Sequence, residues 1–193
     1  MFNNCSSVFD FHLFADDSNR FYTHSDFQHL EQNVNRELSE IGLWLRANKL
    51  SLNVAKTHLV IFHPHQKKIN NSLNIEKDGR PINQQKSVKY LGILIECHIY
   101  WKEQIQQISK KYISRGIGVL YEIRHFVDTK TLVQLYHAVI LPFITYGCIV
   151  WGNAYDHNIK QLQTIQRKAI RLLTFSNFDA HISPLFAKLT EPL

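Results

Sequence analysis

Residues 8–23 read VFDFHLFADDSNRFYT and predict a β-hairpin. Apolar residues occupy alternate positions over residues 9–15, and residues 18–23 supply a partner strand. The turn between the strands holds Asp16 and Asp17, although two-residue turns favour Asn-Gly or Asp-Gly, whose central residues adopt positive φ more readily. Adjacent like charges at a turn break a local rule, and broken local rules are typical of functional positions.

Two neighbouring carboxylates at a hairpin tip have an evident chemical use. Mg²⁺ is a hard ion that binds oxygen ligands, commonly one or two carboxylates together with substrate phosphates. Asp16 and Asp17 therefore form a candidate site for cations that assist the in-line attack of a hydroxyl on a phosphate. The alternative is an ordinary acidic turn at the surface, and the pair taken alone favours that alternative.

The segment after the hairpin predicts a long amphipathic helix. Ser25 is the expected N-cap, and Glu31, Arg36, Glu37 and Glu40 are expected to face solvent. The expected buried stripe consists of Phe27, Leu30, Val34, Leu38, Ile41 and Leu45.

Three further segments of the first half predict strands. Residues 57–62 indicate a short buried strand, and residues 88–95 form a β-branched run. Residues 73–82 centre on Asp78-Gly79, a strong hairpin signal.

From residue 101 onward the apolar period becomes helical. A first helix is expected to end near Phe126, a second is kinked or stopped by Pro142, and a third begins near Asn158. The inward residues are expected to be Ile105, Ile108, Tyr112, Val119 and Ile123 in the first, Leu132, Leu135 and Val139 in the second, and Ile159, Leu162, Ile165, Ala169 and Leu172 in the third. The sequence thus predicts an α+β fold, with β-hairpins and a packed helix in residues 1–102 and an all-helical region in residues 103–193.

Composition narrows the class of protein. The chain has 193 residues, 45% of them hydrophobic, and a net charge of +6, which permits a nucleic-acid partner. Its helical part is the more basic, with a net charge of +4 against +2 for residues 1–102. Three cysteines without a CxxC pair argue against a disulfide framework and a cysteine zinc site, and the histidines have no zinc-finger spacing. The sequence contains no GxxxxGK[ST], GxSxG or HExxH pattern, which argues against the corresponding nucleotide-binding, hydrolase and protease classes.

The expected location is intracellular, in cytoplasm or nucleus, because the N-terminus lacks the features of a signal peptide. Residues 131–155 carry no Asp, Glu, Lys or Arg, which leaves a membrane span as an alternative. The strongly apolar part, residues 138–151, is short and contains Pro142, so a buried core segment is favoured. No membrane partner is therefore expected.

An ordered set of motifs gives the chain a family resemblance. In chain order they are FADD (14–17), NKLSLNVAKT (48–57), KYLGI (89–93), LPFITYG (141–147), WG (151–152) and QRKAIR (166–171). This order and spacing resemble the C-terminal part of the reverse transcriptase, an RNA-directed DNA polymerase, of jockey-like non-LTR retrotransposons. The resemblance runs from Val8 to about Leu189 and implies the end of a polymerase palm followed by a helical thumb.

The resemblance implies roles for individual residues of the palm. Asp16 and Asp17 match the catalytic aspartates of motif C, with Asp16 the main metal ligand, and Lys56 matches the lysine of motif D that orients the triphosphate or protonates pyrophosphate. Phe14 stands where the family more often has Tyr, which leaves the carboxylates in place. The primer grip matches Tyr90, Leu91 and Gly92. Taken without the family, Lys56 is an ordinary solvated residue and Gly92 an ordinary bulge glycine.

The helical half then matches the thumb, which contacts the template–primer duplex through its phosphates. The candidate backbone contacts are Lys110, Lys111, Arg115, Arg167, Lys168 and Arg171. The alternative for each is an ordinary solvated helix face. In the complete enzyme the resemblance implies an RNA template, a DNA primer, dNTP and Mg²⁺, with two-metal nucleotidyl transfer.

The front of the family pattern is missing from the sequence. Motif A, with a further metal-binding aspartate, and motif B precede the Asp-Asp hairpin in this family, and the hairpin strand here begins near Val8. We therefore expect a fragment that does not polymerise alone. Two alternatives remain open: a non-catalytic nucleic-acid-binding remnant of a mobile element, and a decayed product that does not fold.

Overall fold

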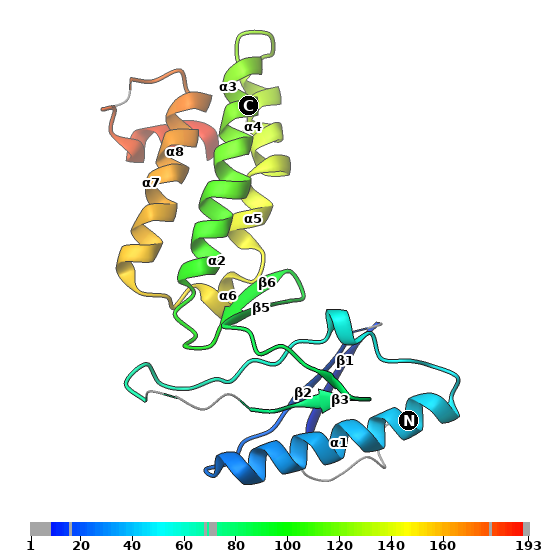
Figure 1. Ribbon diagram of the computed structural model, residues 1–193. Coiled ribbons are helices and arrows are strands. Elements are labelled where there is room, and N and C mark those ends of the chain that lie inside the picture. Colours follow the sequence, from blue (N-terminus) through cyan, green and yellow to red (C-terminus); the bar gives the residue numbers. More distant parts are fainter. Residues whose placement is uncertain (1–8, 16, 68, 70–72, 178, 191–193) are drawn as a thin grey trace. The chain divides into compact units, whose positions relative to one another are not determined.

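The computed structural model describes residues 9–15, 17–67, 69, 73–177 and 179–190 (Figure 1). Contacts divide the chain into two compact units, Met1–Val88 and Lys89–Leu193. The first combines short strand pairs with one long helix, and the second is mostly helical. The expected α+β class is confirmed. The palm and thumb boundary near residue 102 stays a prediction.

The first unit opens with the hairpin that the alternating pattern predicts. Strands β1 (Asp10–Phe14) and β2 (Asp17–Phe21) pair antiparallel, with Phe14 opposite Asp17. Ala15 has a φ of 48°, a left-handed value that a tight connection requires. Asp17 is consequently a strand residue just beyond the turn.

Helix α1 (Phe27–Ala47) begins one residue later than predicted. Its N-cap is Asp26, whose carboxylate accepts the Gln28 backbone N–H at 2.7 Å, so the expected cap at Ser25 is wrong. Four residues of the predicted apolar stripe, Phe27, Leu30, Val34 and Leu38, pack on Leu73, Ile75 and Ile82. The other members of this core are Val54, Leu59 and Ile61.

Glu37 is the exception on the polar face of α1. Only 2% of it is exposed, although the pattern places it toward solvent. The physical reason is its spacing, because Glu37 lies one turn before the buried Ile41 and shares its side of the helix.

The remaining elements of the first unit are short. A 3₁₀ turn, η1 (Val54–Lys56), precedes residues 57–62, which form an isolated bridge between Leu59 and Gln84 and not the predicted strand. Strands β3 (Glu76–Lys77) and β4 (Arg80–Pro81) form the predicted hairpin. Its turn residues Asp78 and Gly79 have φ values of 53° and 72°, as a type I′ turn requires.

The next hairpin leads into the second unit. Strands β5 (Ser87–Tyr90) and β6 (Ile93–Glu96) pair through a turn at Leu91 and Gly92, where the sequence pattern shows one continuous β-branched run. Leu91 and Gly92 have φ values of 45° and 84°, so this turn is also left-handed.

The first long helix of the second unit contains a π-turn. α2 (Lys102–Gln107), η2 (Ile108–Ile113) and α3 (Ser114–Ile123) follow one another directly, and η2 has π geometry. The π-turn inserts one residue into the repeat, so the buried positions after Ile108 move from the predicted Tyr112 and Val119 to Ile113 and Leu120. Val119 is 54% exposed.

The described residues of the second unit form five further helices: α4 (Thr129–Val139), α5 (Leu141–Thr145), α6 (Cys148–Trp151), α7 (Asp156–Leu173) and α8 (Ile182–Thr190). Pro142 stands in the first turn of α5, so the predicted interruption is confirmed. In Figure 1 the helix from α2 to α3 lies between α4–α5 and α7. The core includes Trp101, Ile105, Leu132, Ile140, Trp151, Leu162, Ala169 and Leu173. Across the described ranges, no helix is both long and apolar enough to cross a bilayer.

Candidate functional site

Of the predicted catalytic pair, the structure describes Asp17, which lies at the β1–β2 tip. Asp16 is outside the described residues. Asp17 is exposed and stands opposite Phe14 in the hairpin register. Within the part of the chain that the structure describes, no group of three metal-ligating side chains includes Asp17. An exposed carboxylate is a ligand type that suits a hard cation.

Lys56 is the last residue of η1. Its backbone N–H donates to the Asn53 main-chain oxygen at 3.0 Å and to the Asn53 side-chain oxygen at 3.3 Å. Asn53 therefore caps the turn and fixes where Lys56 leaves the backbone. The Lys56 residue is exposed, and it forms no ion pair with Asp17.

The predicted primer-grip turn is bound to a segment 55 residues further along the chain. The Tyr146 hydroxyl donates to the Leu91 carbonyl at 2.6 Å. A Cβ at position 92 would lie 3.3 Å from the Tyr146 ring, which is tighter than ordinary van der Waals contact. Gly92 is thus required twice, for its φ of 84° and for the approach of this ring.

Tyr146 is itself fixed by its neighbours. The buried Trp151 donates its indole N–H to the Tyr146 carbonyl at 3.0 Å. Gly147 has a φ of 64°, and a Cβ at this position would clash with the end of the Ile93 side chain. The strand pair β5–β6 and the segment from α5 to α6 therefore pack as one piece around the turn.

Sequence reasoning singled out both segments but not their contact. The LPFITYG segment and Trp151 carry part of the family resemblance, and Leu91 and Gly92 carry another part. The glycines were a usable signal, because Gly92 and Gly147 each follow an aromatic or large apolar residue at a break between elements. No pattern in the sequence predicts that these two segments contact one another.

Basic residues lie on neighbouring helices of the second unit. Lys110 and Lys111 in η2, Arg115 in α3, and Arg167 and Lys168 in α7 are exposed. Both η2 and α3 pack on α7, so these cations belong to one helical layer.

The remaining predicted cation, Arg171, has a structural partner. It is half-buried, and its Nε donates to the Ala180 carbonyl at 3.1 Å, which ties α7 to the segment before α8.

An aromatic stack borders the first group of cations. Tyr112 and Phe143 stack at 4.3 Å between ring centroids, and the Lys111 ammonium lies 5.7 Å from the Tyr112 ring centre. This contact holds the lysine stem along η2 while its charge faces solvent.

The chain has recognisable relatives among curated proteins. It is 27% identical over 133 residues to a probable RNA-directed DNA polymerase from transposon X-element of Drosophila melanogaster, an alignment covering 68% of this chain and 14% of the relative. It is 23% identical over 172 residues to a probable RNA-directed DNA polymerase from transposon BS of the same species, covering 83% and 18%.

A third relative is the RNA-directed DNA polymerase from mobile element jockey of Drosophila melanogaster, with 22% identity over 102 residues, 52% of this chain and 11% of the relative. The alignments therefore span less than a fifth of each relative. No family model and no solved structure matches the chain. The curated homologues of this protein are RNA-directed DNA polymerases of Drosophila non-LTR transposons, which confirms the resemblance to the jockey-like family.

Proposed function

We propose that this chain is the C-terminal palm and thumb part of a reverse transcriptase that copies RNA into DNA. The observation that carries the proposal is the similarity to three transposon polymerases, one alignment of which covers 83% of the chain. The exposed Asp17 at a hairpin tip agrees with it, because a polymerase needs carboxylates that reach the reacting phosphates.

In the complete enzyme, Asp16 and Asp17 hold divalent cations, for which Mg²⁺ is the natural ion with oxygen ligands. When bound, such cations supply charge neutralisation around the phosphates during nucleotidyl transfer. The primer 3′-hydroxyl attacks the α-phosphate of a dNTP, and pyrophosphate leaves. Lys56 orients the triphosphate or donates a proton to the leaving pyrophosphate.

The turn of Tyr90, Leu91 and Gly92 contacts the primer strand near its 3′ end. The place of a side chain at Gly92 is taken by the Tyr146 ring, so the nucleic-acid backbone meets the turn on the side away from Tyr146. Its rigid attachment to Tyr146 supports this role, because positioning a primer terminus requires a turn that keeps one conformation.

Site-directed variants of the complete polymerase test the catalytic assignment. Primer extension on an RNA template with Mg²⁺ is expected to be lost in Asp16→Ala and in Asp17→Ala. Asp10→Ala is the matched control, because Asp10 is an exposed aspartate of the same hairpin that has no assigned role. Equal loss in Asp10→Ala, or full activity in both catalytic variants, contradicts the proposal.

The 193-residue chain alone supplies a second test. We expect no primer extension from it, and extension is expected once the remaining palm and fingers are supplied. Extension by the pure chain that disappears in Asp16→Ala contradicts this part of the proposal.

A second candidate function is non-catalytic binding of nucleic acid by the helical unit. It is favoured by the exposed cations Lys110, Lys111, Arg115, Arg167 and Lys168 on adjoining helices. Such binding is sequence-tolerant and weakens steeply with salt, because each neutralised phosphate contributes about 0.9 to the slope of log K against log salt. A mobility shift across salt concentrations tests it, and no binding at low salt removes it.

A further inference from the structure

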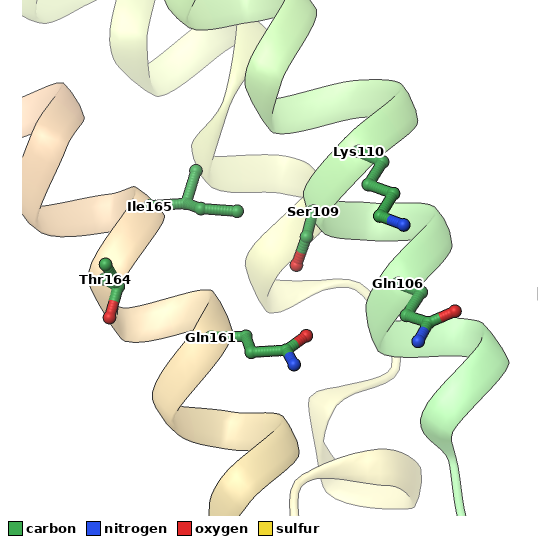
Figure 2. A pocket seen from close by; sticks show the side chains of 6 residues that line it. All are labelled: Gln106, Ser109, Lys110, Gln161, Thr164 and Ile165. Carbon is green, nitrogen blue, oxygen red and sulfur yellow. The ribbon is translucent and has the colours of Figure 1, made fainter.

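A groove of about 390 Å³ runs between the first long helix and α7. Its lining residues are Gln106, Ser109, Lys110, Gln161, Thr164 and Ile165 (Figure 2). Figure 2 shows Gln161 extending from α7 toward the helix of Ser109, with the Ser109 hydroxyl directed into the space between them. None of the lining residues is acidic, and Lys110 brings a positive charge.

Ser109 has an unsatisfied hydroxyl in this groove. The residue is 3% exposed, and its Oγ has no hydrogen-bond partner among the described residues. A buried hydroxyl without a partner destabilises a fold, so such groups usually meet a ligand or an ordered water. A ligand that offers an oxygen acceptor relieves this cost.

Ser109 lies in the π-turn η2, and its hydroxyl has no partner within its own helix among the described residues. Serines within regular helices often bond a preceding carbonyl of their own helix. Here the Ser109 carbonyl is occupied by the Ser114 hydroxyl at 2.8 Å, and the Ser109 hydroxyl faces α7. π-turns of a single turn's length occur frequently at functional sites.

The available groups are mainly donors. Ser109 offers a hydroxyl, Gln106 and Gln161 offer amide N–H groups, and Lys110 offers an ammonium. Thr164 adds no donor, because its hydroxyl already donates to the Lys160 carbonyl at 2.8 Å. Hydroxyl, amide and ammonium groups are the usual protein contacts to phosphate oxygens.

We propose that this groove binds a backbone phosphate of the nucleic acid, with Ser109 and Gln161 donating to its oxygens and Lys110 balancing its charge. The inference rests on the proposed function for the identity of the ligand. A strand is favoured over free phosphate because positive charge continues beyond the groove. Lys168 follows Thr164 by one turn on α7, and Lys111 is adjacent to Lys110.

The test measures binding of the full 193-residue chain to a short RNA–DNA hybrid by fluorescence anisotropy at low salt. Ser109→Ala and Gln161→Ala are each expected to weaken binding about tenfold or more, the size of one hydrogen bond to a charged oxygen. Ser109→Ala is also expected to leave the thermal unfolding midpoint unchanged or higher, because it removes an unpaired buried hydroxyl. A merely structural serine would lower that midpoint instead.

Matched controls are available on the same helices. Gln163→Ala changes an exposed glutamine two positions from Gln161, on another side of α7, and is expected to bind normally. A hybrid with one methylphosphonate at the contacted position is expected to bind parent and Ser109→Ala equally, since the charged oxygen is absent.

The possible outcomes separate the two proposals. Normal hybrid binding by Ser109→Ala and Gln161→Ala overturns the groove assignment and leaves the proposed function standing. If the parent chain binds no hybrid, the second candidate function, binding of nucleic acid by the chain alone, fails while the polymerase proposal stands, and thermal shifts with inorganic phosphate decide the groove. Stabilisation by phosphate that Ser109→Ala abolishes identifies a free-phosphate site and overturns the strand assignment. No stabilisation shows that the Ser109 hydroxyl holds at most a water, which overturns the groove assignment.

Discussion

The Tyr146 hydroxyl donates to the Leu91 carbonyl at 2.6 Å, joining a turn between two strands to the end of a short helix. Leu91 and Gly92 adopt φ values that ordinary residues avoid, so the turn needs outside support to keep one conformation. Tyr146 provides that support through one hydrogen bond and one ring face.

Tyr146→Phe keeps the ring against Gly92 and removes the hydrogen bond. We expect the free energy of unfolding of the second unit to fall by about 1 kcal/mol, and amide hydrogens near the turn to exchange faster. Urea unfolding and hydrogen exchange measure these effects. Tyr155→Phe is the control, because Tyr155 has a nearly equal exposure, 57% against 56%, and its hydroxyl forms no hydrogen bond with the described residues. Equal losses in both variants would contradict this role of Tyr146.

Two glycines of α3 should respond to alanine with opposite signs. A Cβ on Gly118 meets nothing within 4 Å, so Gly118→Ala should stabilise the protein by about 0.5–1 kcal/mol through helix propensity. A Cβ on Gly116 would lie 2.8 Å from Cγ1 of the fully buried Ile140, so Gly116→Ala should destabilise it by about 1–3 kcal/mol. Thermal unfolding of both variants tests the close approach of α3 to Ile140. Stabilisation by both would show that α3 has room there.

Asn35 connects α1 to the start of the β3–β4 hairpin through both atoms of its amide. Its Nδ2 donates to the Asn74 carbonyl at 2.9 Å, and its Oδ1 accepts the Glu76 backbone N–H at 3.0 Å. Asn35→Ala loses both bonds and is expected to lower the free energy of unfolding of the first unit by about 1–2 kcal/mol. Glu40→Ala, at an exposed position of the same helix, should change it by less than about 0.5 kcal/mol in urea unfolding.

Asp128 caps α4 and links its stability to pH. Hydrogen bonds from the Thr131 side chain and backbone lower the pKa of the Asp128 carboxyl below its ordinary value of 3.8. Because the pKa is lower in the folded state, the ionised cap adds stability above pH 3.8. That stability is lost as the pH falls through the lower folded-state pKa.

Asp128→Asn keeps an oxygen acceptor but does not titrate. Its unfolding midpoint should lie below that of the parent at neutral pH and approach it in acid. Thr131→Val removes the largest cause of the lowered pKa and should reduce the pH dependence of the parent. Thermal unfolding at several pH values measures both effects, and a gap between parent and Asp128→Asn that stays constant into acid contradicts this account.

Local sequence patterns identified most of the helices and strands, but not their exact ends or every residue that faces inward. The β1–β2 and β3–β4 hairpins, α1 and α7 follow from alternation, turn residues and apolar spacing, which act within a few residues. Ser25 and Asp26 are both good caps, and only the backbone conformation selects Asp26. The predicted strand at residues 57–62 lacked a neighbouring strand long enough to pair with, a fact that no local pattern contains.

The residues of the candidate site also fall into two groups: those that local patterns predict, and those whose role depends on contacts between distant segments. The Asp-Asp pair, Lys56 and the predicted primer-grip turn are proposed from motif and spacing. The support of Leu91 by Tyr146 depends on a contact between distant segments. The groove at Ser109 lies at a π-turn. The apolar pattern does not predict this turn, because the turn shifts the helical repeat by only one residue.

The one residue that the π-turn adds to the helix is not needed for the packing of the core. Deleting one residue within η2 would convert the π-turn into regular α-helix, and Ile113 and Leu120 would still face inward, since they would fall on the ordinary α-helical repeat after Ile108. A shortened chain of this kind should therefore fold with an intact interior. What it loses is the π geometry of Ile108–Ile113, the stretch that carries Ser109 and Lys110 beside the groove.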